Sequence, residues 1–390
     1  MVEYENRHAP SSETVGPAVG DSVSSIFDPE QRWQRMNLPD PQAPSPSSHA
    51  PRAQTPIFRA IAYGSHAPNP HNTQAWKFEL VSDTEALLYI DERRLLPATD
   101  PPARQIHIGA GCCIETLAVG MSESGDETDV EYLPRGAHGL EEVGRMPVAR
   151  VALRPSASRC RDDLADVIGQ RQTNRKPYTG PFLSDEEAEV IRGQMSSDDV
   201  EAVILNQPEE MRPLLDIFSR AMEIEATTRH LYEETRVWFR FNESQRRAHR
   251  DGLSIPQTGT DGLKRRLTEW NLRNGNPRQW FSPRSIRPFL KTYRRGIDSA
   301  RGLVLLKTKT NHQSDWLDVG RTFARVTLAL TLLGLTSHPY SQVLQEFPEM
   351  AALQAEFNQL LGVREPENIQ MAVRVGRAER AYVALRRDPA

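Results

Sequence analysis

Strict alternation of apolar and polar residues predicts a β-hairpin near the start of the patterned part of the chain. Two alternating runs, residues 76–80 and 88–90, are separated by the turn-forming sequence Ser82-Asp83-Thr84. A period of two is typical of antiparallel strands that bury one face. The same pattern, or a short continuous apolar run, predicts further strands at residues 130–132, 149–153, 203–205, 303–306 and 371–375.

Apolar residues spaced by three and four positions predict two long helices, at residues 101–122 and 315–333. For the first helix we expect a cap at Asp100, Pro101 in the first turn, one apolar stripe and an end at Gly125. For the second we expect a cap at Ser314 and an end at Gly334. Shorter helices are predicted at residues 56–64, around 164–168, at 348–361, and after a capping box at residues 184–187.

These elements occur in a similar order twice. Each half offers a short helix, a polar segment, a strand, a long helix and a closing strand. We therefore expect an α+β fold of two fused halves, residues 51–158 and 159–390, the second with a partly helical insertion at 208–298. Residues 1–50 are rich in proline and serine and are expected to form a disordered tail, because they bury too little apolar surface to offset chain entropy.

Composition argues against several classes of protein. A net charge of −4 and a pI near 6.2 are atypical of a general nucleic-acid binder. Three cysteines form no disulfide framework, which suits a reducing cytoplasm, and the adjacent Cys112 and Cys113 are expected to be buried and inert. No cluster has the spacing of metal ligands, so no metal is expected. The most apolar segment, residues 326–335, is too short to span a bilayer, and no secretory signal is visible.

The segment 168–177 holds two arginines, Arg171 and Arg175, on either side of Thr173. If the segment ends a helix, residues four positions apart share a face. Two guanidinium forks and a hydroxyl would then suit a phosphate group. The alternative is a solvated, arginine-rich helix end.

A proline-stiffened loop at residues 67–76 carries four side chains that can hydrogen-bond, Asn69, His71, Asn72 and Gln74, and runs directly into the first strand. Together with the arginine segment it resembles the nitroreductase family of FMN-binding oxidoreductases. The order of the two motifs resembles the single-chain, two-halved branch of that family, the acg type, in which one chain imitates the family homodimer.

The resemblance implies roles for these residues. Arg171, Thr173 and Arg175 would hold the FMN phosphate, with Thr173 in place of the usual serine. The loop residues Asn69, His71, Asn72 and Gln74 would contact the flavin from the other half. Asn69 and Ala75 replace the serine and second proline of the usual loop.

Two further segments resemble parts of the family site. Residues 334–341 resemble its Gly-Leu-x-Ser turn, which places Pro339, Tyr340 and Ser341 near the flavin ring. After the last strand, Arg377 is expected to reach the phosphate, and Arg374 is the alternative residue. The other interpretation is that this arginine-rich strand end is solvated and does not bind phosphate. His66, His71 and His107 are expected to be surface or hydrogen-bonded groups rather than catalysts.

The function implied is an FMN-dependent oxidoreductase that transfers hydride from NAD(P)H to a small acceptor such as a nitro compound or quinone. The flavin would carry the chemistry, so no side chain is assigned as catalytic. The alternatives are a flavin-dependent dehydrogenase of a biosynthetic pathway and a non-catalytic FMN-binding or storage protein. We expect a monomeric pseudo-dimer with one FMN and neither nucleic acid nor membrane as partner. The basic run 264–295 is expected to form a flap over the flavin.

Overall fold

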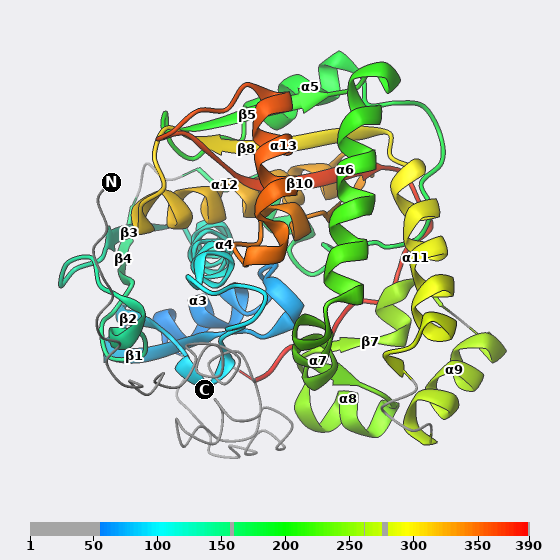
Figure 1. The fold of residues 1–390 in the computed structure, drawn as a ribbon. Helices are drawn as coiled ribbons and strands as arrows, with labels where there is room; N and C mark the ends of the chain where they lie inside the picture. Colours follow the sequence, from blue (N-terminus) through cyan, green and yellow to red (C-terminus); the bar gives the residue numbers. More distant parts are fainter. Residues whose placement is uncertain (1–54, 157–159, 261, 275–279, 389–390) are drawn as a thin grey trace, which may run out of the picture.

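The computed structural model describes residues 55–156, 160–260, 262–274 and 280–388. The predicted tail, residues 1–50, lies outside these ranges. The described chain forms two four-stranded sheets and a small two-stranded one, with helices between and around them, so the predicted α+β class is confirmed (Figure 1).

The first sheet is antiparallel, with the strand order β1-β2-β4-β3. Trp76 pairs with Ile90 across the β1–β2 hairpin, so the predicted hairpin is confirmed. The alternation that predicted it places Leu88 and Ile90 in the core. The strands are β1 (Trp76–Ser82), β2 (Glu85–Ile90), β3 (Asp126–Tyr132) and β4 (Ala149–Pro155).

The second sheet has the strand order β5-β8-β10-β9 and is also antiparallel. Its central strands β8 and β10 are buried along most of their length, which accounts for their continuous apolar sequences. The strands are β5 (Val200–Leu205), β8 (Gly302–Thr308), β9 (Thr336–Pro339) and β10 (Asn368–Gly376).

Two long helices, α4 (Arg104–Met121) and α12 (Gln313–Leu332), pack against each other between the two sheets (Figure 1). They touch at Gly111 and Gly320, each the eighth residue of its helix. A Cβ at Gly111 would lie 2.2 Å from the Leu317 carbonyl oxygen, and one at Gly320 2.1 Å from the Ile108 carbonyl oxygen. Glycine at both positions therefore allows the backbones to approach this closely. An internal pseudo-twofold relates the two helices at this contact, because the same position of each helix makes the same approach to the other.

The starts of both long helices differ from the prediction. Helix α4 begins at Arg104 rather than Pro101, because Ala103 adopts a left-handed conformation with φ of 58°. Asp100 still acts as a cap, accepting hydrogen bonds from the backbone N–H groups of Gln105 and Ile106. Helix α4 is buried on all sides instead of along one stripe. The cap of α12 is His312 rather than Ser314.

Shorter helices flank the sheets at positions that the sequence predicted. They are α3 (Pro56–Gly64), α5 (Asp185–Arg192) and α13 (Ala351–Leu361). The predicted capping box at α5 is confirmed: Ser184 Oγ accepts from the Glu187 N–H, and Glu187 Oε2 accepts from the Ser184 N–H. No helix in the described part of the chain is long and apolar enough to cross a membrane.

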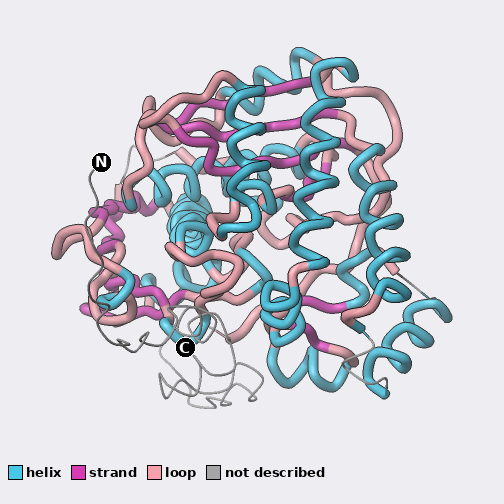
Figure 2. Tube along the Cα trace, viewed as in Figure 1, coloured by secondary structure: helices cyan, strands magenta, loops and turns pink. Residues whose placement is uncertain are grey.

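The described part of the insertion in the second half is mostly helical (Figure 2). Its helices α6 and α11 lie side by side. Two short strands, β6 (Phe239–Arg240) and β7 (Leu253–Ser254), pair in parallel within it. The helices are α6 (Pro208–Thr227), α7 (Arg229–Val237), α8 (Glu243–His249), α9 (Gly262–Asn274) and α11 (Pro283–Asp298).

The predicted helix before the arginine segment is only a short 3-10 helix, Asp163–Val167. The segment that follows is irregular, because Thr173 forms a parallel β-bridge with Ser337. The prediction that Arg171 and Arg175 share one helix face is therefore wrong. The two guanidinium groups contact different residues: Arg171 contacts His66, and Arg175 contacts Gln257.

Candidate functional site

Three segments that are distant in the sequence converge beside the central helices. The arginine segment lies against β9, where the Asn174 N–H donates to the Ser337 carbonyl oxygen over 2.9 Å. The loop of residues 67–76 packs on α4: a Cβ at Gly109 would lie 3.2 Å from the Cβ of Asn69. The structure thus brings together the arginine segment, the amide loop and the turn after α12. Thr173 joins them through its backbone bridge to Ser337.

Arg171 is a buried cation. Its Nη2 donates to the His66 carbonyl oxygen over 3.4 Å, and its Nε has no hydrogen-bond partner in the described chain. Burial lowers the pKa of Arg171 to about 10, partly offset by the Cys112 thiol. A guanidinium group removed from water without a counter-charge favours the binding of an anion.

Arg175 faces a group of aromatic and imidazole rings. Its Nη1 donates to the Gln257 carbonyl oxygen over 3.4 Å. Burial lowers the pKa of Arg175, and the nearby Tyr293 and Tyr178 oppose that effect. The charge of Arg175 in turn helps burial to lower the pKa of both His71 and His338.

The amide loop has a strained backbone. His71, Asn72 and Gln74 all have positive φ angles, of 49°, 54° and 51°. Asn69 supports this shape, because its Oδ1 accepts from the Gln74 N–H over 2.8 Å and its Nδ2 donates to the Ala67 carbonyl oxygen. Strain of this kind is typical of functional loops and persists only where the surroundings hold it.

His71, like Thr73, has a buried polar side-chain atom without a hydrogen-bond partner among the described residues. Burial, followed by the charge of Arg175, lowers the pKa of His71 to about 4, so the ring is neutral near pH 7. Its Nδ1 is buried and has no hydrogen-bond partner in the described chain. The ring therefore has an unused hydrogen-bonding position beside Arg175.

Asn72 and Gln74 bind the chain's own C-terminal segment. Asn72 Nδ2 donates to the Leu385 carbonyl oxygen over 3.2 Å, and Asn72 Oδ1 accepts from Arg386. Gln74 Oε1 accepts from the Arg387 N–H over 2.8 Å. Gln74 also donates to the Arg250 carbonyl oxygen of the insertion. These two amides hold the last residues of the second half against the first.

Arg386 is a site residue that the sequence interpretation missed. Its Nη2 donates to the carbonyl oxygens of His66 and Ala67, the same region that Arg171 contacts. Burial and then the charge of Arg171 lower the pKa of Arg386 to about 9. The sequence signal was the density of arginines after the last strand, for which a solvated end was one interpretation and a phosphate contact by Arg377 or Arg374 the other.

The turn after α12 contributes buried rings. His338 and Tyr340 lie with their ring centroids 4.9 Å apart, and Tyr293 of α11 packs edge-on against both. His338 Nδ1 and the Tyr340 hydroxyl are buried without hydrogen-bond partners among the described residues. Pro339 pairs with Val373 in the sheet, and Ser341 begins a short 3-10 helix, Gln342–Leu344.

Arg374 of β10 and Arg377, which directly follows this strand, have different surroundings. Arg377 pairs with Glu187 at the start of α5. Arg374 is fully buried and donates to the carbonyl oxygens of Asn174 and Lys176, over 3.4 and 3.0 Å. Its guanidinium carbon lies 3.9 Å from the centroid of the Tyr178 ring. Arg374 therefore holds the arginine segment in place through its backbone oxygens. The predicted contact between Arg377 and the phosphate stays a prediction.

Cys112 and Cys113 are buried in α4, and burial raises the pKa of both thiols. The expectation that they are buried is confirmed. No group of three or more His, Cys, Asp or Glu side chains in the described ranges is arranged to hold a metal ion.

No protein-family model matches the chain. It is similar to a protein of Mycobacterium tuberculosis that is provisionally named NAD(P)H nitroreductase acg, at 25% identity over 324 residues. The alignment covers 83% of this chain and 89% of the relative. The chain is a homologue of the acg-type nitroreductases. The resemblance inferred from the motifs is thereby confirmed.

Solved nitroreductases align with little more than half of this chain. The FMN- and NADPH-dependent nitroreductase NfnB of Sphigopyxis sp. strain HMH is 14% identical, with a TM-score of 0.34, covering 56% of this chain and 89% of that one. The NfnB of Mycobacterium smegmatis, solved with NADPH, is 17% identical, with a TM-score of 0.33, covering 55% and 88%. The relation to the family therefore rests on the mycobacterial relative and on the motifs.

Proposed function

We propose that this acg-type chain binds one FMN at the site described above and transfers hydride from NAD(P)H to a small acceptor such as a nitro compound or quinone. The observation that carries the proposal is the pair of guanidinium groups of Arg171, which is buried, and Arg386, which is half-buried. The hydrogen-bond acceptors found for the two among the described residues are neutral oxygens. A phosphate monoester would supply the missing negative charge.

The residues present fit the cofactor. Arg171, Arg386 and the hydroxyl of Thr173 would hold the phosphate. Buried polar atoms without partners in the described chain, on His71, His338 and Tyr340, would hydrogen-bond to the polar edge of a flavin ring. Arg175, whose charge acts on His71 and His338, would oppose negative charge on the reduced ring. FMN when bound would accept hydride from NAD(P)H and pass it to the acceptor.

The pseudo-twofold explains why we propose a single FMN. Arg171 interacts electrostatically with Cys112, which is the ninth residue of α4. The equivalent ninth residue of α12 is Arg321. Arg321 forms an ion pair of 2.7 Å with Glu115. Arg325, one turn later, pairs with Glu115 and with Asp162. At the position that the pseudo-twofold relates to Arg171, the arginines are therefore already paired with carboxylates of the chain. We infer that no second phosphate binds there.

Anaerobic rapid mixing of the FMN-loaded chain with NADPH tests the proposed reaction. We expect the flavin absorbance near 450 nm to bleach in a saturable way, and a nitroaromatic compound or a quinone to restore it with release of reduced product. Full FMN occupancy combined with failure of both NADPH and NADH to reduce the flavin would overturn the proposal. That outcome would instead favour FMN storage.

One observation favours the storage alternative as the second candidate. Arg175 is covered by the insertion, through the Gln257 carbonyl oxygen and the half-buried side chain of Tyr293. If this cover excludes the nicotinamide, a variant such as Tyr293→Ala should increase the rate of reduction. An unchanged or lower rate would argue against storage.

A further inference from the structure

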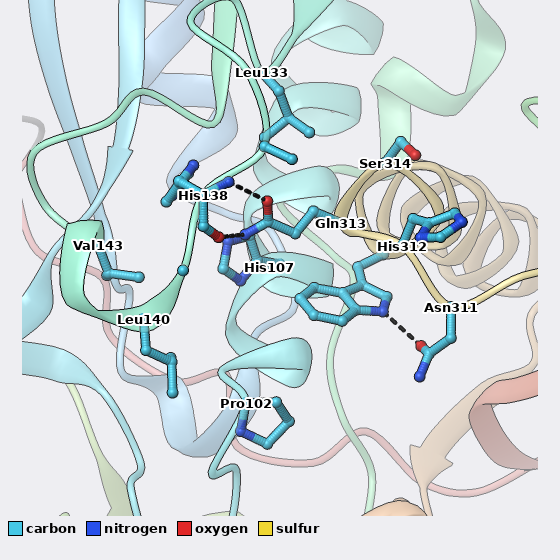
Figure 3. A pocket seen from close by; sticks show the side chains of 13 residues that line it. Pro102, His107, Leu133, His138, Leu140, Val143, Asn311, His312, Gln313 and Ser314 are labelled. Carbon is cyan, nitrogen blue, oxygen red and sulfur yellow. Dashed lines mark hydrogen bonds between the residues drawn. The ribbon is translucent and has the colours of Figure 1, made fainter.

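A pocket lies at the seam between the two halves, at the first turns of the two long helices (Figure 3). It has a volume of about 480 Å³ and is closed on one side by the loop of residues 133–143. His107 of α4 and Trp316 of α12 both line it. Each is the fourth residue of its helix, so the pocket sits on the internal pseudo-twofold.

His107 offers a buried hydrogen-bond acceptor to this pocket. Its side chain is 1% exposed, and its Nδ1 lies 2.7 Å from the Ala103 carbonyl oxygen. Because a carbonyl oxygen only accepts, Nδ1 carries the proton and Nε2 carries a lone pair. Burial lowers the pKa of His107 to about 4, so this neutral form persists near pH 7. Nε2 has no partner among the described residues.

His138 stands opposite His107 on a loop that is fixed in place. Gln313 clamps the backbone of His138 in both directions, accepting from its N–H over 3.0 Å and donating to its carbonyl oxygen over 2.9 Å (Figure 3). The two imidazole centroids are 6.3 Å apart. Neither ring nitrogen of His138 has a partner in the described chain. A neutral His138 would donate one hydrogen bond and accept another.

The walls around these imidazoles are partly apolar, and Asn311, His312, Gln313 and Ser314 form their polar part. Leu133, Leu140, Val143 and Pro102 line the pocket, together with the Trp316 ring, which stands edge-on to His107 at a centroid distance of 5.4 Å. Trp316 Nε1 already donates to Asn311. No Asp, Glu, Lys or Arg side chain is among the residues that line the pocket within the described ranges. Such walls favour a neutral ring and disfavour an ion.

We propose that this seam pocket binds a small neutral aromatic molecule that carries an N–H or O–H donor, a compound of the phenol or indole class. The donor would hydrogen-bond to His107 Nε2, and the ring would lie between the apolar side chains and Trp316. The site is separate from the proposed flavin site and does not depend on it. Because both halves build the pocket, bound ligand would also strengthen their contact.

Isothermal titration of the full chain with indole, and with its donor-free isostere indene, tests the proposal. We expect one saturable indole site per chain and about threefold to tenfold weaker binding of indene, the usual effect of one lost hydrogen bond. His107→Phe should remove the difference between the two probes. His230→Phe, in α7 and outside the pocket, is the matched control and should preserve it.

Leu140→Trp provides a second variant that does not disturb the core, since Leu140 is 43% exposed at the pocket. The larger side chain should block indole binding while thermal unfolding of the free protein stays unchanged. Loss of binding in Leu140→Trp would therefore support the pocket even if His107→Phe failed to fold. Absence of saturable binding by both indole and phenol, or binding that survives Leu140→Trp at full strength, would overturn the proposal.

Discussion

Arg171 and Arg386 converge on one carbonyl oxygen. Both donate to the carbonyl oxygen of His66, each over 3.4 Å, although one arginine precedes the insertion and the other lies near the end of the chain. Burial, and then the charge of Arg171, lowers the pKa of Arg386. Two like charges held together in a partly buried place are unfavourable unless an anion joins them.

The first prediction concerns this arginine pair. Arg171→Ala and Arg386→Ala should each weaken FMN binding by about 1.5–3 kcal/mol, the size of a charge-assisted hydrogen bond. Arg171→Lys should be milder, because lysine keeps the charge and loses the planar fork. Fluorescence titration with FMN measures these effects. Arg192→Ala, at an exposed ion pair with Glu189, is the control and should leave affinity unchanged. Full affinity in the double variant would show that the pair does not bind phosphate.

The second prediction concerns Arg374. Arg374→Met should lower the free energy of unfolding in urea by about 3 kcal/mol or more, because the hydrogen bonds of a fully buried guanidinium group to the carbonyl oxygens of Asn174 and Lys176 would be lost. The same variant should weaken FMN binding, since the arginine segment would lose its support. Normal stability together with normal FMN affinity would contradict the supporting role.

The third prediction concerns the crossing of the long helices. Gly111→Ala and Gly320→Ala should each destabilise the protein by about 3 kcal/mol or more, because the new Cβ would meet backbone that cannot move aside. Gly139→Ala is the matched control: the φ of Gly139 is −81°, and no atom lies within 4 Å of its added Cβ. Thermal unfolding of the three variants decides the matter, and equal melting temperatures would refute the tight crossing.

The fourth prediction concerns Glu225 of α6. Burial raises the pKa of this carboxyl group to about 7, and one of its oxygens has no partner in the described chain. An unfolded glutamate titrates near pH 4.3, so between about pH 4.5 and 7 the folded state holds the extra proton. Stability should therefore fall as pH rises through this range, by about 3 kcal/mol in total.

Glu225→Gln should remove this loss. Urea unfolding at pH 5 and pH 8.5 measures this effect. The difference in free energy of unfolding between variant and parent should shift by about 3 kcal/mol in favour of the variant from pH 5 to pH 8.5. Glu223→Gln, at an exposed position of the same helix, should follow the parent. Parallel pH dependence in all three proteins would mean that Glu225 is not protonated in the folded state.

The local elements of this fold could be predicted from the sequence because their causes are local. Alternation determined the hairpin of β1 and β2, and the side chains of Ser184 and Glu187 determined the start of α5. The start of α4 was misplaced because Asp100 caps it across a left-handed Ala103, a conformation that no residue nearby signals.

The site could be predicted only in part, because its geometry depends on distant contacts. The motifs identified the segments that converge, but the bridge from Thr173 to Ser337 prevents the helix that would have aligned Arg171 with Arg175. Arg386 was missed because its place depends on how Asn72 and Gln74 hold the returning tail. None of these pairings leaves a periodic pattern in the sequence.

The absorbance spectrum of the purified chain, with FMN released and counted after denaturation, tests the central claim most directly. The account predicts a yellow protein that carries close to one FMN per chain, because the partly buried pair of Arg171 and Arg386 has no carboxylate partner among the described residues while Arg321 and Arg325 are already paired with carboxylates. Two FMN per chain would contradict the single site. A colourless protein that leaves added FMN unbound would contradict the flavin assignment itself.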